Sequence, residues 1–315
     1  MNFIEDIKTR VKSNNKKTII LTEGYDNRVL KAIEYILKED LADVILIGKP
    51  SYYIPGLKIV IPEESNLLNI FTTELYNLRK HKGLTIEKSK ELLLTNYMYF
   101  ACMLLKYNLA DSIVSGAVNT TANTFKPALQ ILDKTSLIAS SFMIMDIPNK
   151  DPFIFSDIAL NINPTSEELS TIAIDTCNSY KKIFNKDAYA ALLSYSSFGS
   201  AKGDSVDKIK KTLDIIQIKK PNLYIDGEMQ LDTAIDTNVA KIKAPNSIVS
   251  GKANVLIFPD LNSGNIGYKL VNRFSNAKAY GPFIQGLNKT VSYLSRVSST
   301  EEIINTILIT CLLTV

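Results

Sequence analysis

A hydroxyl, a guanidinium and a carboxylate lie close together near the C-terminus, on Ser295, Arg296 and Glu302. If one pocket holds all three, Arg296 offers a fork for an anion, Ser295 a hydroxyl donor and Glu302 a base. Spacing also gives Glu302 a structural role, because Ser299 and Glu302 match a capping box ahead of an apolar helix. Spacing alone favours the cap, and the catalytic alternative stays open.

The segment 115–127 is a second candidate, in which a short strand runs into small residues and then into a Thr- and Asn-rich cap. We expect Pro127 in the first helical turn. Free backbone N–H groups and the helix dipole would make this turn an anion site, strengthened by Lys126. Because caps outnumber anion sites, a well-capped helix with a surface lysine is the commoner explanation.

The segment 195–205 follows an apolar strand and precedes a helix, the position where open α/β sheets bind ligands. It does not match the P-loop pattern, and the chain contains no Gly-x-Gly-x-x-Gly signature. Its small residues and Lys202 nevertheless suit close approach to a phosphate. A flexible strand–helix loop is the alternative, and both stay open.

The segment 258–269 is rich in Asp, Asn and Gly. We expect a buried strand to end at Pro259, followed by a polar turn and an amphipathic helix. Gly264 and Gly267 suggest tight turning or close approach of a ligand. Polar turns of this composition are common, so the segment alone indicates little.

These segments sit in a chain of ordinary globular composition. It has 315 residues, 46% of them hydrophobic, and a formal charge of +4, too mild to indicate nucleic-acid binding. Its length favours two domains. Among 36 basic residues only five are Arg, so we expect the remaining Arg to lie where a planar fork is needed. The five are Arg10, Arg28, Arg79, Arg273 and Arg296.

Short strand-like runs alternate with amphipathic segments, which predicts an α/β protein with parallel sheet. A domain boundary is expected near residue 140, because 142–155 resembles two successive strands around two prolines. The predicted strands are 17–21, 44–48, 58–61, 112–115, 190–195, 222–225 and 254–259. The predicted helices include 27–38, 86–107, 166–184 and 206–218.

The N-terminus lacks the basic start and apolar core of a signal peptide, and the most apolar stretches, 92–105 and 303–315, are too short to span a membrane. We therefore expect a cytoplasmic protein without membrane contact. Three cysteines without paired spacing argue against a disulfide framework or a zinc site. With His81 as the one histidine, a histidine-based metal site is effectively excluded.

Taken together, these segments resemble the phosphate acetyltransferase (phosphotransacetylase) family over nearly the whole chain. Several blocks in the same order make the resemblance more specific than any single motif. The related butyryltransferases usually differ within 265–268 and 285–289, so acetyl is favoured over butyryl. The matching blocks are 22–30, 79–83, 115–129, 161–165, 243–245, 257–269 and 281–296.

The resemblance implies reversible transfer of an acetyl group between coenzyme A and inorganic phosphate, giving acetyl phosphate. It implies two three-layer α/β/α domains with largely parallel sheets and an interdomain cleft. We place the first domain at 1–139 with 285–315, which holds the C-terminal helix, and the second at 140–284. The resemblance further implies a homodimer, with coenzyme A as a substrate, no bound cofactor and no metal.

Residue by residue, the family's anion-stabilising pair falls on Ser295 and Arg296, and its catalytic acid on Glu302. Coenzyme-contacting arginines fall on Arg79 and on the position of Lys126. A free thiol has a pKa near ~8.5, so a carboxylate base would help coenzyme A to attack the acetyl carbon. The other predicted substrate-binding residues are Thr121, Ser197, Gly199, Ser200, Lys202, Asn262 and Asn265.

The chain departs from the family at several positions. The family usually has Asp where this chain has Glu302, Arg at Lys126, His at Asn119 and Cys at Ile158, and a different sequence at 290–293. The Glu302 departure leaves two alternatives, an active phosphate acetyltransferase or a non-catalytic acyl-coenzyme A-binding regulator of the same fold. A phosphate butyryltransferase is a further alternative, whereas the missing dinucleotide signature disfavours a dehydrogenase.

Overall fold

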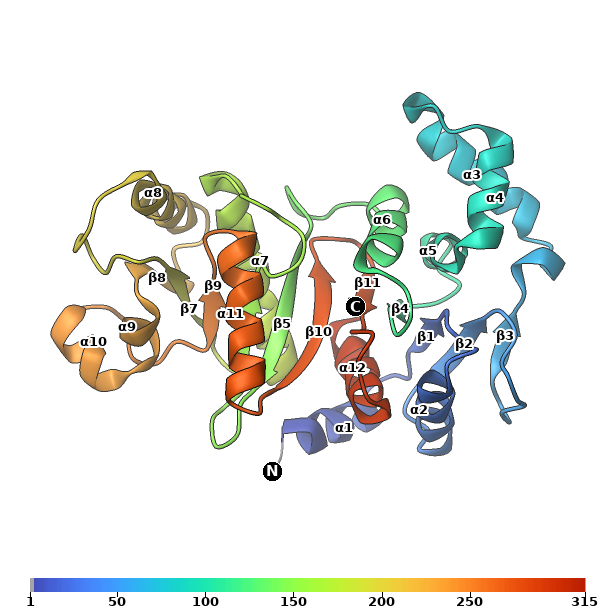
Figure 1. Cartoon of the computed structure of the whole chain (residues 1–315), viewed down its shortest axis with the longest axis horizontal. Helices are drawn as coiled ribbons and strands as arrows, with labels where there is room; N and C mark the ends of the chain where they lie inside the picture. The colour runs from blue at the N-terminus through green and yellow to red at the C-terminus, as the bar shows by residue number, and fades with distance from the viewer. Residues whose placement is uncertain (1–2, 315) are drawn as a thin grey trace. The chain divides into compact units, whose positions relative to one another are not determined.

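The computed structural model describes residues 3–314 and divides the chain into two compact units (Figure 1). Unit 1 comprises Met1–Asp133 and Leu287–Val315, and unit 2 comprises Lys134–Gly286. The chain therefore leaves unit 1 once and returns to it. The two domains predicted from the sequence, 1–139 with 285–315 and 140–284, stay a prediction.

Unit 1 is built on a parallel sheet with strand order β3-β2-β1-β4-β11. Because all five strands are parallel, their carboxyl ends share one edge of the sheet, and the loops that follow them lie there. The strands are β1 Thr18–Leu21, β2 Asp43–Ile47, β3 Lys58–Val60, β4 Ser112–Ser115 and β11 Thr290–Tyr293.

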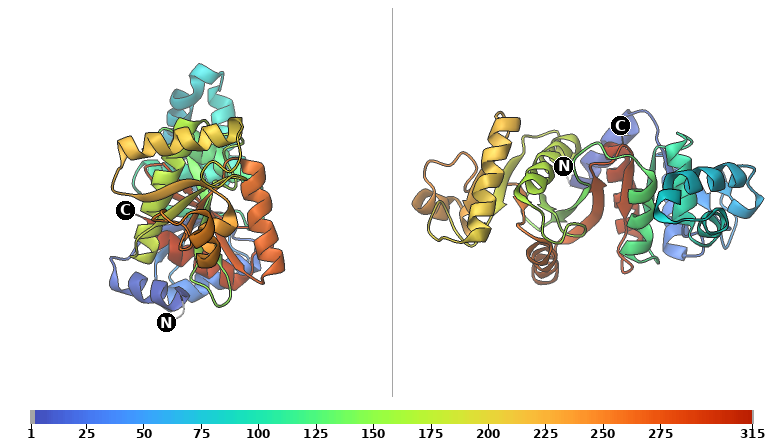
Figure 2. Two further views of the ribbon diagram at one scale, coloured as in Figure 1. Left: turned by 90° about the vertical axis from the view of Figure 1, so that its left-hand side faces the viewer. Right: turned by 90° about the horizontal axis from the view of Figure 1, so that it is seen from above.

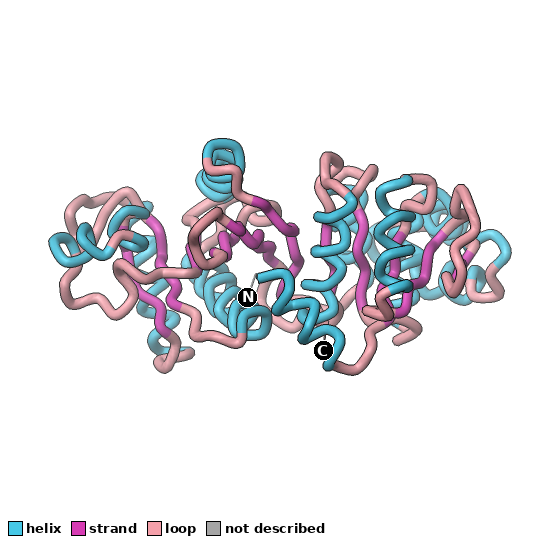
Figure 3. Tube along the Cα trace, turned by 90° about the horizontal axis from the view of Figure 1, so that it is seen from below, coloured by secondary structure: helices cyan, strands magenta, loops and turns pink. Residues whose placement is uncertain are grey.

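Helices cover both faces of this sheet. Helix α12 contacts α1, α2, β4 and β11, while α5 and α6 contact each other and pack on β2, β4 and β11. Figure 3 shows α2 and α12 side by side on the same face of the sheet. The helices are α1 Phe3–Ser13, α2 Asn27–Lys38, α3 Leu68–Arg79, α4 Ile86–Thr95, α5 Tyr97–Lys106, α6 Thr121–Ile131 and α12 Thr300–Leu313, with short 3-10 turns Pro62–Glu64 and Lys80–Lys82.

Unit 2 has strand order β10-β5-β6-β9-β7-β8, in which β5 runs antiparallel to its two neighbours and the other pairs are parallel. The predicted pair of strands in 142–155 is confirmed as β5 and β6. The strands are β5 Ser140–Asp146, β6 Phe153–Ser156, β7 Tyr189–Leu193, β8 Tyr224–Met229, β9 Val255–Ile257 and β10 Lys278–Gln285.

The helices of unit 2 also lie on both faces of its sheet. Helix α7 contacts β6, β7, β9 and α8, whereas α11 contacts β5 and β6 from the opposite face (Figure 2). Apolar side chains such as Met145, Phe155 and Leu256 fill the core between sheet and helices. The helices are α7 Ser166–Phe184, α8 Asp204–Lys219, α9 Leu231–Ile235, α10 Thr237–Lys243 and α11 Leu261–Phe274.

The single helix predicted for 86–107 is wrong in one respect, since the structure contains two helices that meet at Asn96. The Asn96 backbone is extended, and its side-chain oxygen accepts a hydrogen bond from Met98 N at 3.1 Å, which caps the second helix. Asn favours such caps because its side chain competes with the helical backbone for hydrogen bonds. Apolar periodicity continues through the break and therefore hides it.

The position predicted for Pro127 is also wrong, because Pro127 lies inside α6 rather than in its first turn. Proline has no N–H to donate to the carbonyl one turn earlier, here that of Asn123. The Asn123 carbonyl instead accepts a hydrogen bond from Asn96 Nδ2 at 3.2 Å. This side-chain contact makes an interior proline tolerable in α6.

The polar stretch predicted as a turn after Pro259 is largely helical. Asp260 caps α11 by accepting a hydrogen bond from Ser263 N at 2.9 Å, so the helix begins at Leu261. Asn262, Gly264, Asn265 and Gly267 all belong to this helix. An early Asp cap overrides the turn preference of the Asn and Gly residues that follow it.

Burial makes the three cysteines poor nucleophiles, since all of them are buried free thiols. Burial raises the pKa of Cys177 and Cys311 to about 12 and raises that of Cys102 above its usual range. We expect Ellman's reagent at about pH 8 to modify the native thiols far more slowly than the thiol of free coenzyme A. Unfolding in guanidinium should expose all three, and a native thiol that reacts as fast as coenzyme A would contradict this prediction.

Within residues 3–314, no helix is both long enough and apolar enough to cross a membrane. The same residues contain no group of three or more His, Cys, Asp or Glu side chains arranged to hold a metal ion.

Candidate functional site

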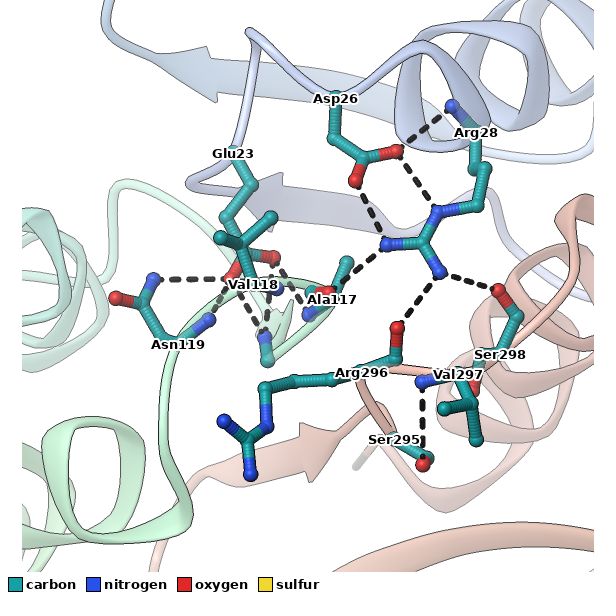
Figure 4. Close-up of polar contacts among 11 residues, drawn as sticks. Glu23, Asp26, Arg28, Ala117, Val118, Asn119, Ser295, Arg296, Val297 and Ser298 are labelled. Atoms are coloured by element: carbon teal, nitrogen blue, oxygen red, sulfur yellow. Dashed lines mark hydrogen bonds and ion pairs between the residues drawn. The ribbon is translucent and has the colours of Figure 1, made fainter.

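Three loops of unit 1 meet at the carboxyl edge of its sheet, those that follow β1, β4 and β11 (Figure 4). The strands are neighbours, in the order β1-β4-β11, so their loops are brought together although they are far apart in sequence. The first loop contributes Glu23 and Asp26 and leads into Arg28 in the first turn of α2, while the second contributes 116–119 and the third 295–298.

Glu23 is 1% exposed, and its carboxylate lies within the loop that follows β4. It accepts backbone hydrogen bonds from Gly116, Ala117, Val118 and Asn119 at 3.0–3.1 Å, and one from Asn119 Nδ2 at 2.9 Å. The prediction that the N–H groups of this turn are free to bind an anion is therefore wrong for 116–119. The protein's own carboxylate occupies the place of the anion.

Arg28 joins the first loop to the other two. Its guanidinium donates to both carboxylate oxygens of Asp26, to the carbonyl of Ala117, and to the carbonyls of Arg296 and Ser298. Asp26 also caps α2 by accepting from Arg28 N at 2.8 Å. The hydrogen bond from Arg28 holds the pKa of Asp26 below its usual range, so this ion pair persists at neutral pH.

Ser295 and Arg296 lie on an exposed turn between β11 and α12, which is closed by a 2.9 Å hydrogen bond from Ser298 N to the Ser295 carbonyl. Among residues 3–314 the guanidinium of Arg296 has no hydrogen-bond or ion-pair partner, in contrast to that of Arg28. Figure 4 shows it extending away from the Asp26–Arg28 pair. An unpartnered fork of this kind is available to bind an anion such as phosphate.

Glu302 forms the capping box that its spacing indicates. Its Oε2 accepts from Ser299 N at 2.7 Å, and Glu302 N donates to Ser299 Oγ at 3.2 Å. The structural role is therefore confirmed. One carboxylate oxygen, Oε2, makes the cap, while Oε1 has no hydrogen bond within the described part of the chain. A cap and a base are thus compatible on the same side chain.

The other predicted ligand residues of unit 1 lie on α3 and α6, which contact each other. Arg79 ends α3, and the hydroxyl of Tyr99 on α5 donates to Gln130 of α6 at 2.9 Å. Lys126 is exposed one turn before Gln130 on α6, and Thr121 begins that helix. In the described residues neither Arg79 nor Lys126 has a hydrogen-bond or ion-pair partner, which leaves two more cations available to anions.

In unit 2 the loop 194–203 is held by an internal carboxylate. Glu228 is 1% exposed and accepts from Gly199 N at 2.7 Å and from Ser196 Oγ at 3.0 Å. Ser197 N donates to Ser200 Oγ, and Ser197 Oγ accepts from Gln230 N, both at 2.9 Å. The loop is therefore internally bonded rather than open to a phosphate, while the Lys202 ammonium has no partner among the described residues.

Asp157 holds the loop that follows β6 through hydrogen bonds, as Glu228 holds the loop 194–203. It is 3% exposed and accepts hydrogen bonds from the backbone N–H groups of Ser141 and of 159–161, from Asn161 Nδ2 and from Ser141 Oγ. Asn265 Nδ2 donates to the Ile158 carbonyl at 3.1 Å, which ties α11 to this loop. Asn262 is exposed in the first turn of α11 and forms no side-chain hydrogen bond with the described residues.

Because Gly264 has no side chain, α11 can approach the loop that contains Asp157 closely at this position. The atom of that loop nearest to Gly264 belongs to the backbone. A Cβ at Gly264 would lie 2.3 Å from the Asp157 carbonyl oxygen, whereas one at Gly267 would meet the Phe258 ring at 3.0 Å. We expect Gly264→Ala to lower the free energy of unfolding by about 1–3 kcal/mol, because the helix must shift. Gly267→Ala is the matched control, because the Phe258 side chain can rotate away from the new methyl group. Alanine is also more favourable than glycine within a helix by about 1 kcal/mol, so this variant should be no less stable than the wild type. Urea unfolding of both variants measures this difference, and equal stabilities would refute the explanation.

Comparison with known proteins gives one consistent result. Residues 2–311 match the family model described as phosphate acetyl/butaryl transferase. A phosphate acetyltransferase of Clostridium acetobutylicum is 46% identical over 98% of both chains. One from Thermoanaerobacterium thermosaccharolyticum is 42% identical, also over 98% of both chains.

Solved structures give the same result for the fold. A phosphotransacetylase from Streptococcus pyogenes matches with a TM-score of 0.91 and 36% identity, covering 99% of this chain and 97% of the other. A branched-chain phosphotransacylase from Enterococcus faecalis matches with a TM-score of 0.71 at 21% identity, covering 93% and 97%, which is evidence for the fold alone. The predicted mixed α/β fold, with mostly parallel sheet, is confirmed.

Proposed function

Because the chain belongs to the phosphate acetyl/butaryl transferase family, we propose that it catalyses reversible transfer of an acetyl group between coenzyme A and inorganic phosphate. The observation that carries this proposal is the 42–46% identity to phosphate acetyltransferases over 98% of the chain. An exposed turn with Ser295 and Arg296, whose guanidinium has no partner in the described residues, supports it. The acetyl group leaves the phosphate oxygen as the thiol sulfur attacks its carbonyl carbon, and phosphate departs with the bonding electron pair.

We assign roles to three residues of the loop after β11 and the start of α12. Arg296 binds the phosphoryl oxygens through two N–H groups and neutralises charge on the leaving phosphate. Ser295 donates its hydroxyl hydrogen to the oxyanion that develops at the acetyl carbonyl. Glu302 accepts the thiol proton during attack and returns it in the reverse direction.

Coenzyme A carries several phosphate charges, which suits the two remaining unpartnered cations of unit 1. We propose that Arg79 and Lys126 bind these phosphates, with Thr121 at the start of α6 donating a hydrogen bond. In unit 2 the proposed contacts are with Lys202 and Asn262, whose side chains are exposed. Ser197, Gly199, Ser200 and Asn265 support these contacts less directly, because their polar groups already hold the loops together.

One assay of the purified protein tests the proposal. With acetyl phosphate and coenzyme A, thioester absorbance should increase, and with acetyl-coenzyme A and phosphate the thiol should appear. Coenzyme A binding by calorimetry without turnover in either direction would instead favour a non-catalytic acyl-coenzyme A-binding regulator. A faster rate with butyryl phosphate than with acetyl phosphate would favour a phosphate butyryltransferase.

The proposal includes a homodimer that works in the cytoplasm, as expected for this family. Sedimentation velocity should give one species of twice the chain mass of 35.1 kDa. A species of the single-chain mass at micromolar concentration would contradict the dimer while leaving the catalytic proposal unaffected.

A further inference from the structure

We infer that Arg28 is a positioning residue, which fixes the backbone of the 295–298 turn so that Arg296 meets the phosphate in a productive geometry. Arg28 does not itself contact substrate in this inference. The inference rests on the proposed function, because it gives Arg28 a role only through Arg296.

The first observation is that every N–H group of the Arg28 guanidinium has a protein acceptor. A guanidinium carries five N–H donors. Nε donates to Asp26 Oδ1 at 3.1 Å, Nη2 to Asp26 Oδ2 at 2.7 Å and to the Ala117 carbonyl at 2.9 Å. Nη1 donates to the carbonyls of Arg296 at 2.9 Å and Ser298 at 2.8 Å. No donor remains for a substrate anion.

The second observation is where those acceptors lie. The carbonyls of Arg296 and Ser298 are on either side of Val297, so one nitrogen of Arg28 holds two peptide planes of the turn (Figure 4). The Ala117 carbonyl belongs to the loop that Glu23 holds through the Ala117 N–H. Arg28 therefore connects the exposed turn to a loop that is itself fixed by a buried carboxylate.

The third observation is the contrast between the two arginines. The Asp26 carboxylate compensates the charge of Arg28, with an Nη2–Oδ2 distance of 2.7 Å. The Arg296 side chain is exposed, and no carboxylate of the described residues pairs with it. One guanidinium is thus used to hold backbone, and the other is left to bind an anion.

The geometry explains why this position requires Arg in a chain that otherwise uses Lys. Only five of the 36 basic residues are Arg. An ammonium has three donors at a single point and cannot reach a carboxylate fork and three carbonyls in different directions. Lysine at position 28 would keep the charge but release part of the turn.

The test is a double-mutant cycle between positions 28 and 296. We expect Arg28→Lys to lower kcat/KM for acetyl phosphate about 10- to 100-fold, because misplacing a binding group by about 1 Å costs rate on this scale. The KM for coenzyme A should change less than about twofold, a split that general destabilisation would not produce. In the Arg296→Ala background, Arg28→Lys should change kcat/KM less than about twofold, because nothing remains to be positioned.

Arg10→Lys is the matched control, since the partly exposed Arg10 pairs with Asp6 at 3.6 Å within α1. It should leave all rate constants unchanged. If Arg28→Lys does not fold, Asp26→Asn replaces it in the double-mutant cycle. This change weakens the ion pair between Asp26 and Arg28 while keeping the shape of the side chain at position 26.

The outcomes separate the two claims. Suppose that Arg296→Ala lowers kcat/KM. If Arg28→Lys then lowers kcat/KM by the same factor with and without Arg296, or does not lower it at all, the positioning inference is overturned and the proposed function stands. If Arg296→Ala retains the wild-type rate, the proposed role of Arg296 fails and the inference fails with it.

Discussion

Exchange of Glu302 for glutamine is expected to lower kcat about 10²- to 10⁴-fold, with little change in the affinity for coenzyme A. The amide cannot accept the thiol proton, so attack must proceed without a base. Glutamine serves at this position of a capping box as glutamate does, and α12 should therefore keep its cap. Steady-state kinetics with acetyl phosphate and coenzyme A, together with calorimetric coenzyme A binding, measure the two quantities.

The capping role calls for a control that removes the cap and keeps the carboxylate. Ser299→Ala does this, because Ser299 Oγ accepts from Glu302 N at 3.2 Å. It should lower the free energy of unfolding by about 1 kcal/mol and change kcat only slightly. A wild-type rate in Glu302→Gln would remove Glu302 from the mechanism, while equal rate losses in both variants would assign its importance to the cap. Glu302→Asp is informative as well, since it restores the residue type usual in the family.

Glu23→Gln is expected to have the largest effect on stability, lowering the free energy of unfolding by about 3 kcal/mol or more. Hydrogen bonds to a charged acceptor are each worth about 1.5–3 kcal/mol, and a buried donor left without an acceptor has a further cost. The new amide group would direct N–H donors at the N–H groups of 116–119, which now point at a carboxylate. Urea unfolding monitored by circular dichroism measures the loss.

Activity should fall with stability in this variant, because the Ala117 carbonyl also holds Arg28. Glu64→Gln is the matched control, since the Glu64 carboxylate is 65% exposed and its partner Lys49 lies at 3.6 Å. It should change the free energy of unfolding by less than about 0.5 kcal/mol. If Glu23→Gln were as stable as the control, the buried carboxylate would not be what orders the loop.

Local pattern was sufficient to predict most elements of the fold. Helices α2 and α7 have the predicted ends, because a cap and a change in apolar periodicity coincide at each. Four of the five strands of unit 1 were predicted within about a residue from short runs rich in β-branched side chains, whereas β11 was not predicted. The break at Asn96 was missed because apolar periodicity continues through its local cap. Pro127 was misplaced because the carbonyl that it leaves without a helical donor, that of Asn123, is satisfied by Asn96, 27 positions earlier in the chain.

The site was only partly predictable, for a related reason. The spacing of Ser299 and Glu302 predicted the capping box because both partners lie in one turn. Glu23 and Gly116, the first residue of the loop that binds it, are separated by 93 positions, so segment 115–127 resembled an open anion site. Two sequence signals pointed at Arg28, the scarcity of Arg and the matching block 22–30, but neither said what the planar fork would bind.

The internal carboxylates Glu23, Asp157 and Glu228 have a consequence for product release. Glu23 and Asp157 each accept hydrogen bonds from several backbone N–H groups of a loop, and Glu228 accepts from Gly199 N and the Ser196 hydroxyl, so these loop donors already have acceptors within the protein. A reaction that runs in both directions must let phosphate and acetyl phosphate leave as readily as they arrive, and tight binding of either one would slow a direction. The proposed binding of phosphate therefore depends on solvent-exposed side chains such as Arg296, and fewer fixed hydrogen bonds would have to break when phosphate leaves.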